Sequence, residues 1–324
     1  MHRRKFLKTL SAATSGALLS PLAGFSAAAQ SSGSLAMLTA TAPPDLVCHL
    51  YYYAEMLGFY KELGLNFRVT PVANDPTALR GVLAGEGDIG WCGALTTLQA
   101  LRTGAAIKVL SSFVPLLDYK MVGRKTIASM KDLAGQPVAV SQVGAVSQIV
   151  PKIMIEADGG DVGKVQWVSA GGGPNRFQAL VAGRVAAAPL NALHGNLAAQ
   201  MTDKFHVIAT ADKALPDFLY TLDIVPTKVV ETKKGELQAF LRGTRKASQW
   251  ASENVKEAAA LSKKILPDVD LKELEGALGD FAKNNYWSRT GEVATKAWTY
   301  TTEALVKSGE LANAPALDQV VAKL

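Results

Sequence analysis

Short apolar runs alternate with stretches of helical periodicity along most of the chain. Runs such as LAMLTAT (35–41) and PVAVSQ (137–142) are typical of buried strands, and most runs are followed by residues that are apolar at helical spacing. The pattern predicts strands at 35–41, 65–72, 88–93, 107–114, 137–142, 165–171, 185–190, 205–210 and 219–225. It predicts helices at 46–63, 76–83, 94–103, 145–157 and 175–182, the second of them capped by Asp75, and a mostly helical tail from 228 to 324.

This alternation predicts an α/β protein with two lobes. Strands joined by helices are expected to be parallel, because the helix returns the chain to the same end of the sheet. The pattern falls into two series, which join near residues 115–125 and again near 212–222. A length of 324 residues also fits two domains. We predict lobe one from residues 30–118 and 220–324 and lobe two from residues 119–219, with the two connections acting as a hinge.

The N-terminus has the organisation of an export signal. A basic segment, HRRKFLK (2–8), precedes a mildly apolar run from Thr9 to Phe25, and small residues follow. We expect residues 1–29 to form a signal peptide, which places the mature protein in the periplasm. The adjacent arginines resemble a twin-arginine signal, although His2 stands where Ser or Thr is usual. A membrane anchor is disfavoured, because the run is short and rich in Gly, Ser and Ala.

The net charge of +6 does not indicate a nucleic-acid-binding protein. Four basic residues lie within the first eight positions, and the rest of the chain holds 30 basic and 28 acidic residues. The sequence shows no basic stripe with interleaved aromatic residues, which single-strand binders use. We therefore expect no nucleic-acid partner.

Three motifs carry a resemblance to a known family. They are AEMLGFYKELGL (54–65), LAGEGDIG (83–90) and KDLAGQPVAV (131–140), with Gln136 where a Lys is commoner. In this order and spacing they resemble the periplasmic substrate-binding proteins of nitrate, sulfonate and taurine transporters, a group that also includes binders of thiamine-pyrimidine precursors. The resemblance covers roughly residues 35–250.

The resemblance implies the periplasmic binding protein type II fold and a protein that is not an enzyme. Such a protein closes its lobes on a small molecule and delivers it to the permease of an ABC importer. We expect a monomer without a cofactor. The chain contains no dinucleotide or Walker phosphate motif and no His, Cys and carboxylate cluster with metal-site spacing.

Lobe two offers the clearer candidates for a ligand site. In open α/β sheets, ligands bind beyond the carboxyl ends of the strands, near helix N-termini. Two loops, 141–145 and 171–176, place glycine and small polar residues there, so that backbone N–H groups can bind an anion. Plain connecting turns are the alternative, and for Arg176 the alternative is an exposed helical arginine. The candidates are Ser141, Gly144, Ala145, Gly172, Gly173, Asn175, Arg176 and Asn191.

Lobe one offers candidates at three strand ends. Trp91 could stack on a planar ligand or lie in the core. Tyr51, Tyr52 and Tyr53 are consecutive in a predicted helix, so at least one must face the cleft or solvent. Cys48 and Cys92 could form a disulfide or remain free and buried. The candidates are Pro44, Asp45, Trp91, Cys92, Ser112 and Phe113.

These candidates predict a small organic anion as the ligand, with an aromatic acid or a sulfonate first and a pyrimidine-like heterocycle next. Two other functions remain open. One is an enzyme similar to thiamine-pyrimidine synthases, which use pyridoxal phosphate bound through a Lys and a His. The other is a periplasmic sensor that presents its ligand to a receptor.

Overall fold

The computed structural model describes residues 33–42 and 44–324. The predicted signal peptide, residues 1–29, lies outside the described residues, as does Pro43. Within the described part of the chain, no helix is both long enough and apolar enough to span a bilayer.

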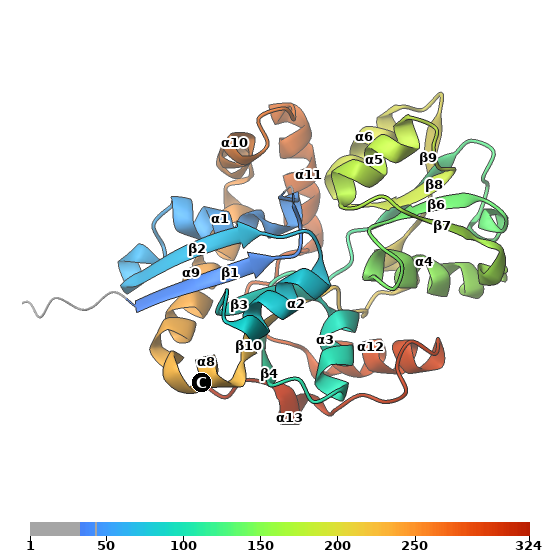
Figure 1. The fold of residues 1–324 in the computed structure, drawn as a ribbon. Helices are drawn as coiled ribbons and strands as arrows, with labels where there is room; N and C mark the ends of the chain where they lie inside the picture. The colour runs from blue at the N-terminus through green and yellow to red at the C-terminus, as the bar shows by residue number, and fades with distance from the viewer. Residues whose placement is uncertain (1–32, 43) are drawn as a thin grey trace, which may run out of the picture. The chain divides into compact units, whose positions relative to one another are not determined.

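The strands form two separate five-stranded sheets (Figure 1). The strands of the first sheet are β1 (Gly33–Thr39), β2 (Leu65–Pro71), β3 (Ile89–Gly93), β4 (Ile107–Ser111) and β10 (Thr221–Pro226). Those of the second are β5 (Lys120–Arg124), β6 (Pro137–Val140), β7 (Gln166–Ser169), β8 (Ala187–Leu190) and β9 (Phe205–Thr210). We call the first sheet with its helices lobe one, and the second sheet with its helices lobe two. The predicted residue boundaries of the lobes stay a prediction.

The two sheets share one topology. Their strand orders are β2-β1-β3-β10-β4 and β7-β6-β8-β5-β9. The pairs β1/β2, β1/β3, β6/β7 and β6/β8 are parallel, as predicted, whereas β10 and β5 run antiparallel to both of their neighbours. The prediction of parallel strands is wrong for β10, and β5 was not predicted as a strand, since residues 115–125 were assigned to the connection. Both strands are antiparallel because each enters its sheet directly from the other lobe and not through a crossover helix.

Helices connect the strands and form most of the C-terminal region, as the periodicity predicted. The α-helices are α1 (His49–Met56), α2 (Asp75–Ala84), α3 (Ala94–Arg102), α4 (Val146–Ala157), α5 (Gly173–Val181), α6 (Ala192–Gln200), α7 (Ala211–Ala214), α8 (Thr227–Thr232), α9 (Lys234–Glu253), α10 (Val255–Ile265), α11 (Leu271–Asn284), α12 (Thr295–Lys307) and α13 (Leu317–Val320). The 3-10 helices are η1 (Leu46–Cys48), η2 (Lys61–Leu63), η3 (Met130–Leu133) and η4 (Val162–Lys164).

The predicted helix at 46–63 is divided in the structure. It begins as η1, continues as α1, and ends with a turn and η2. Gly58 has φ 76° and Gly64 has φ 70°, a left-handed conformation that glycine adopts without a steric penalty. Gly58 therefore ends the helical stretch, and Gly64 turns the chain into β2.

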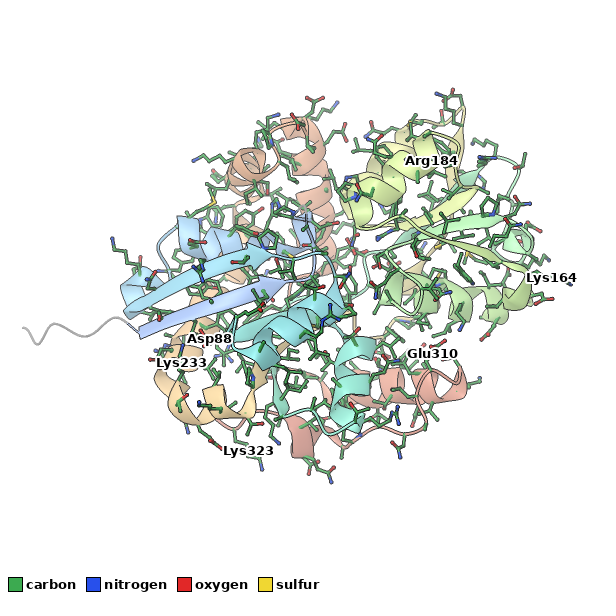
Figure 2. All side chains as sticks on the ribbon, in the orientation of Figure 1. Asp88, Lys164, Arg184, Lys233, Glu310 and Lys323 are labelled. Atoms are coloured by element: carbon green, nitrogen blue, oxygen red, sulfur yellow. The ribbon has the colours of Figure 1, made fainter. Side chains whose placement is uncertain are left out.

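Lobe one has a core rich in aromatic side chains. The Tyr51 ring stacks on Phe240 of α9 with ring centroids 6.1 Å apart, and Tyr60 packs on Phe67 at 4.3 Å. Beside lobe one's first strands, Asp88 accepts a hydrogen bond from Ala36 N and pairs with Lys233 Nζ at 2.7 Å (Figure 2). Asp88 therefore connects β1 to the start of α9.

Two connections join the lobes, and they run side by side. The first lies between β4 and β5, and the second lies between α7 and β10. They form an antiparallel bridge between Leu116 and Leu219, and Tyr220 N donates to Pro115 O at 2.8 Å. This paired arrangement is the one expected of a two-segment hinge.

The lobes also contact each other away from the connections. Lys152 of α4 forms an ion pair with Glu310, which follows α12 (Glu310 is labelled in Figure 2). Asn196 Nδ2 of α6 donates to Asp280 Oδ2 of α11 at 3.0 Å. Polar contacts therefore connect the lobes on two sides.

Candidate functional site

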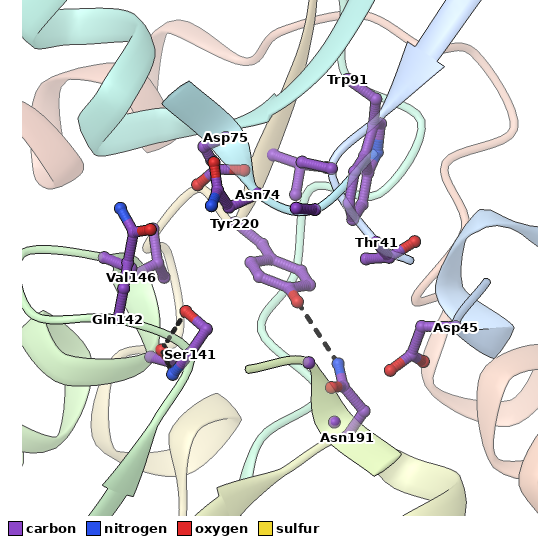
Figure 3. A pocket seen from close by; sticks show the side chains of 18 of the residues that line it. Thr41, Asp45, Asn74, Asp75, Trp91, Ser141, Gln142, Val146, Asn191 and Tyr220 are labelled. Atoms are coloured by element: carbon purple, nitrogen blue, oxygen red, sulfur yellow. Dashed lines mark hydrogen bonds between the residues drawn. The ribbon is translucent and has the colours of Figure 1, made fainter. Parts of the chain in front are cut away.

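A cavity of about 60 Å³ lies where the two lobes meet (Figure 3). Its walls come from the loops after β1, β2, β6, β7 and β8, from the end of β3, and from both connections between the lobes. Its volume is small compared with the roughly 300–1,000 Å³ of typical ligand pockets. The lobes therefore lie close together. Lobe one contributes Ala40, Thr41, Asp45, Ala73, Asn74, Asp75, Pro76, Trp91 and Gly93, the connections contribute Tyr119, Tyr220 and Thr221, and lobe two contributes Ser141, Gln142, Ala145, Val146, Ser147, Gly172, Gly173, Arg176 and Asn191.

In lobe two, the loop after β6 uses its polar groups internally. Ser147 Oγ accepts a hydrogen bond from Ser141 N at 2.8 Å and lies 2.7 Å from Ser141 Oγ. Gly144 N donates to Gln148 Oε1 at 2.7 Å. Ser141 and Ala145 line the cavity, whereas Gly144 does not. The Gly144 N–H is hydrogen-bonded to Gln148 and is therefore not directed at a ligand.

The N-terminus of α5 forms the second part of this wall. Gly172 is the N-cap without a side-chain hydrogen bond, and Gly173 is the first helical residue. An added Cβ on Gly173 would lie 2.7 Å from Asp45 Oδ2 of lobe one. Glycine therefore allows the two lobes to approach within contact distance here.

Arg176 is buried, with 3% of its surface exposed, so the alternative of an exposed helical arginine is wrong. Its Nε donates to Pro189 O at 2.8 Å, its Nη1 to Gly171 O at 3.1 Å, and its Nη2 to Asn191 Oδ1 at 3.5 Å. The guanidinium carbon lies 5.7 Å from the centre of the Tyr119 ring. Arg176 thus lines the cavity and also fixes the ends of two strands and a helix.

Asn191 connects the cavity to the hinge. Its Nδ2 donates to Asp118 Oδ1 at 2.8 Å. The same atom donates to Tyr220 Oη at 3.3 Å (Figure 3). Asp118 belongs to the first connection, and Tyr220 belongs to the second. Asp118 Oδ2 also accepts from Ala192 N, the first N–H of α6, at 2.9 Å. A change at Asn191 is therefore transmitted directly to both hinge segments.

The lobe-one wall carries two carboxylates. Asp45 is 3% exposed, and its Oδ1 has no hydrogen-bond partner among the described residues. Asp75 lies at the first position of α2, with Thr96 Oγ1 3.5 Å from its Oδ2. Burial raises the pKa of Asp75 to about 6. Both carboxylates face the cavity.

The cap of α2 differs from the one predicted. Asp75 was expected to cap this helix, but Asn74 is the N-cap, and its Oδ1 accepts from Thr77 N at 3.1 Å. Because Asn74 satisfies the helix N-terminus, the Asp75 side chain is free to face the cavity.

Aromatic side chains complete the walls. Trp91 is 2% exposed and lines the cavity, so it is both a core residue and a wall residue. Its ring packs edge-on against Tyr220 at 6.1 Å between centroids. Tyr51 and Tyr53 are buried in lobe one, whereas Tyr52 is half-buried, which confirms that the three cannot all be buried.

Three lobe-one candidates lie outside the cavity lining for reasons of strand geometry. Cys92 is buried and points to the opposite side of β3 from Trp91 and Gly93, because side chains alternate along a strand. Ser112 Oγ donates to Thr221 O at 2.7 Å, and Phe113 is fully buried against Phe240. β10 separates β4 from β3 and so moves residues 112–113 away from the cavity. These three predictions are not supported by the structure.

Two further candidates lie close to the cavity without lining it. Pro44 precedes Asp45 but does not contribute to the wall. Asn175 is exposed and lines a shallow hollow on the outer side of α5, together with Gln178 and Arg184. Neighbouring residues on a helix point in different directions, so Arg176 faces the cavity and Asn175 does not. The structure thus brings together Asp45, Trp91, Ser141, Ala145, Gly172, Gly173, Arg176 and Asn191.

The sequence analysis missed several residues of the wall, among them the polar and aromatic side chains of Asn74, Asp75, Tyr119 and Tyr220. The Asn-Asp-Pro segment at 74–76 was a usable signal, since it directly follows a predicted strand and opens a helix. The two tyrosines had no such signal, because their position follows from the pairing of the two connections.

Two other buried carboxylates lie near the cavity. Burial raises the pKa of Asp118 to about 7, with a smaller contribution from Asp45 in the same direction. Burial also raises the pKa of Asp223 to about 7, although Ser111 and Tyr51 donate hydrogen bonds to it. Both groups therefore titrate near neutral pH.

Cysteine and histidine side chains form no metal site in the described parts of the chain. Cys48 and Cys92 are free and buried, which settles the choice between a disulfide and separate thiols. His49 is buried, its Nδ1 lies 2.8 Å from Ser262 Oγ, and burial lowers its pKa to about 3.

Solved structures with this arrangement include three binding proteins. The alkanesulfonate-binding protein SsuA from Xanthomonas axonopodis pv. citri, bound to MOPS, has a TM-score of 0.72 at 12% identity, covering 89% of this chain and 98% of its own. The periplasmic nitrate-binding protein NrtA from Synechocystis PCC 6803 has 0.69 at 13%, covering 89% and 86%. The ligand-binding component of an ABC-type import system from Staphylococcus aureus, with zinc bound, has 0.69 at 12%, covering 89% and 96%. This chain therefore has the periplasmic binding protein type II fold.

No curated protein matches the chain in sequence. A family model described as NMT1/THI5 like matches residues 47–258, which is more than half of the chain and includes most of the cavity wall. The chain belongs to the NMT1/THI5-like family.

Proposed function

We propose that this protein is the substrate-binding component of an ABC import system. It holds a small molecule between its lobes and presents the closed form to a permease. One observation carries the proposal: both sheets and both connections line the same cavity. A molecule that fills this cavity contacts both lobes, so its binding favours the closed population.

The similar solved structures support this proposal, since they are a ligand-binding component of an ABC-type import system and binders of alkanesulfonate and nitrate. We extend it to a monomer in the periplasm, as the predicted signal peptide and the resemblance both imply.

Asn191 provides a route from ligand to hinge. It lines the cavity and donates hydrogen bonds to Asp118 and Tyr220, one on each connection. A ligand that orders Asn191 therefore stabilises one hinge arrangement. The permease needs only to distinguish the closed lobes from the open ones.

For the ligand, the sequence predicts an organic anion, an aromatic acid or a sulfonate. The N-termini of α4 and α5 support it, since their first N–H groups lie at the cavity and favour negative charge. The aromatic rings of Trp91 and Tyr220 support a flat body. The carboxylates of Asp45 and Asp75 weigh against an anion, because like charges repel strongly in a poorly hydrated site.

A binding protein is also favoured over the alternative of a pyridoxal-phosphate enzyme. That chemistry requires a lysine at the site, and the described residues that line the cavity include no lysine. Absorbance of the purified protein tests this alternative, because bound pyridoxal phosphate absorbs visible light.

The test of the proposal is ligand-dependent closure. Protein purified under native conditions is denatured, and the released small molecules are identified by mass spectrometry. Refolded protein is then titrated with the released molecule while tryptophan fluorescence and the radius of gyration from small-angle scattering are measured. We expect saturable fluorescence change and a smaller radius of gyration. Saturable binding without any change in the radius of gyration would contradict closure.

A further inference from the structure

The cavity has more carboxyl groups than basic groups in and behind its wall. Among its described lining residues, Asp45 and Asp75 are the acidic side chains and Arg176 is the basic one. Asp118 lies directly behind Asn191 and adds a third carboxylate near the wall. A ligand that enters this cavity therefore meets more acidic than basic groups.

Asp45 is the carboxylate most in need of a partner. It comes from the loop after β1 and is 3% exposed, yet no described residue donates a hydrogen bond to its Oδ1. Figure 3 shows its carboxylate directed into the space between Thr41 and Asn191. Burial of a charge is unfavourable unless the charge is paired and hydrogen-bonded. The side chain is thus placed to receive a donor from the cavity.

Arg176 does not supply this donor. Three of its N–H groups are directed at Pro189 O, Gly171 O and Asn191 Oδ1, all within lobe two. Its position is fixed by these acceptors and by the Tyr119 ring. No hydrogen bond or ion pair joins Arg176 to Asp45 in the described structure. His194 also lies beside Gly173 and Asp45, but its Nδ1 has no hydrogen-bond partner among the described residues, and burial lowers its pKa, which favours the neutral imidazole. No described basic group therefore pairs with the Asp45 carboxylate, which leaves it for the ligand.

We infer that the ligand carries a positively charged nitrogen, of the ammonium or amidinium type, and that Asp45 binds this group. Asp75 is the second carboxylate on the same wall and assists it. Trp91 and Tyr220 pack against the ligand body, and the small cavity volume favours a compact molecule. This inference rests on the proposed function, and it reverses the sign of charge that the helix N-termini alone suggest.

The N-termini of α4 and α5 have a compatible role. The Asp45 carboxylate approaches Gly173, the first residue of α5, which is the position that favours an anion. Asp45 therefore takes part of the place that an anionic ligand would need. A cation bound to Asp45 adds charge of the opposite sign and avoids this competition.

The experiment compares probes of the same shape and opposite charge. Wild-type protein is titrated with benzamidinium, benzoate and benzenesulfonate, and with the smaller set acetamidinium, acetate and methanesulfonate, at constant ionic strength. Isothermal calorimetry gives the affinities. We expect the cation to bind more tightly than both anions in each set that binds. The charge of any molecule released from natively purified protein is determined in parallel, and we expect a basic nitrogen.

Two variants test whether Asp45 is responsible for the preference for a cation. Asp45→Asn keeps the shape of the side chain and removes its charge, and we expect it to weaken binding of the cation by at least about 30-fold, as measured for buried charge pairs at interfaces. Asp75→Asn should weaken it less. The control is Asp203→Asn, which makes the same charge change at an exposed position in lobe two and should leave affinity unchanged.

The outcomes separate the two claims. Tighter binding of the anions, with closure of the lobes, would overturn the inference and leave the proposed function intact. Equal loss of cation affinity in Asp45→Asn and Asp203→Asn would remove Asp45 from the site. If Asp45→Asn does not fold, the comparison of probe charges in the wild type still decides. If no probe binds and no molecule is released from the natively purified protein, both the proposed function and the inference are wrong.

Discussion

The two walls of the cavity are built differently. Lobe one contributes side chains, with the carboxylates of Asp45 and Asp75 and the indole of Trp91. Lobe two contributes backbone at the N-termini of α4 and α5 together with Arg176 and Asn191, and most of the polar groups of these two side chains already have partners within the protein. Lobe one therefore carries the groups that still need a partner, and we assign to it the choice of ligand. Lobe two supplies a fixed surface against which the ligand is held.

The largest expected effect is on the stability of lobe one. Trp91→Ala removes a ring that is 2% exposed and leaves a cavity beside Tyr220. We expect the free energy of unfolding to fall by about 3–5 kcal/mol, in the range for buried aromatic residues replaced by alanine. Urea denaturation of the ligand-free protein measures this. A loss below about 1 kcal/mol would show that the ring belongs to the ligand site and not to the core.

Asp223, a buried carboxylate in lobe one, makes the stability of the protein depend on pH. The pKa of Asp223 is raised by burial to about 7, whereas an unfolded aspartate titrates near about 3.9. Between these values the folded protein holds a proton that the unfolded chain has released. The free energy of unfolding therefore falls as the pH rises through this window.

The variant Asp223→Asn isolates this contribution. Between pH 5 and pH 8, we expect the free energy of unfolding of this variant to change less than that of the wild type. The two changes should differ by about 2–4 kcal/mol, since one pKa unit corresponds to about 1.4 kcal/mol. Asp203→Asn is the control and should keep the wild-type slope. Urea denaturation at both pH values gives the comparison, and identical slopes in all three proteins would contradict it.

The close approach of the two walls can be tested at one atom. Gly173→Ala places a Cβ 2.7 Å from Asp45 Oδ2 and 3.2 Å from Asn191 Oδ1, so the Asp45 carboxylate or the two walls must shift. We expect ligand affinity to fall by about tenfold, or about 1.4 kcal/mol, with little change in stability. In Gly172→Ala the nearest atom is Pro174 Cδ at 3.8 Å, so this variant should bind almost normally. Calorimetric titration measures the ligand affinity of both variants. Equal affinities would show that binding does not require contact between the two walls.

The smallest expected effect concerns the contacts outside the cavity. Lys152→Gln breaks the ion pair with Glu310 that connects lobe two to the C-terminal region. Because partly exposed ion pairs contribute about 0–1 kcal/mol, ligand affinity should change by no more than about fivefold. Lys164→Gln breaks a pair within lobe two and is the control. A larger loss for Lys152→Gln would mean that closure depends more on this contact than on the ligand.

The difference between the two cavity walls also explains which residues of the site could be predicted from the sequence. Lobe two's wall follows local signals, since glycine and serine directly after apolar runs mark strand ends. Six of the eight candidates there line the cavity: Ser141, Ala145, Gly172, Gly173, Arg176 and Asn191. The donors of Arg176, however, are directed at carbonyl groups. The direction of a long side chain depends on neighbours that are distant in sequence, and no local pattern contains that information.

Lobe one was harder to predict for a topological reason. Its strands were placed correctly to within a few residues, but the position of β10 between β3 and β4 depends on pairing between segments far apart in the chain. Without that position, Ser112 and Phe113 were assigned to the cavity. Asp75 was missed for a different reason: Asn and Asp both cap helices, and only the structure shows that Asn74 has this role.

The central position of β10 also constrains how the protein reaches its native state. β3 and β4 are synthesised before lobe two, and the strand that separates them begins only at Thr221. Until that segment emerges from the ribosome, both strands have an unpaired edge, and unpaired edges favour intermolecular association. All the strands of lobe two lie in one continuous stretch of chain, so it can assemble earlier. Lobe one must therefore mature last, and the nascent chain is most prone to aggregation in the interval before β10 is made.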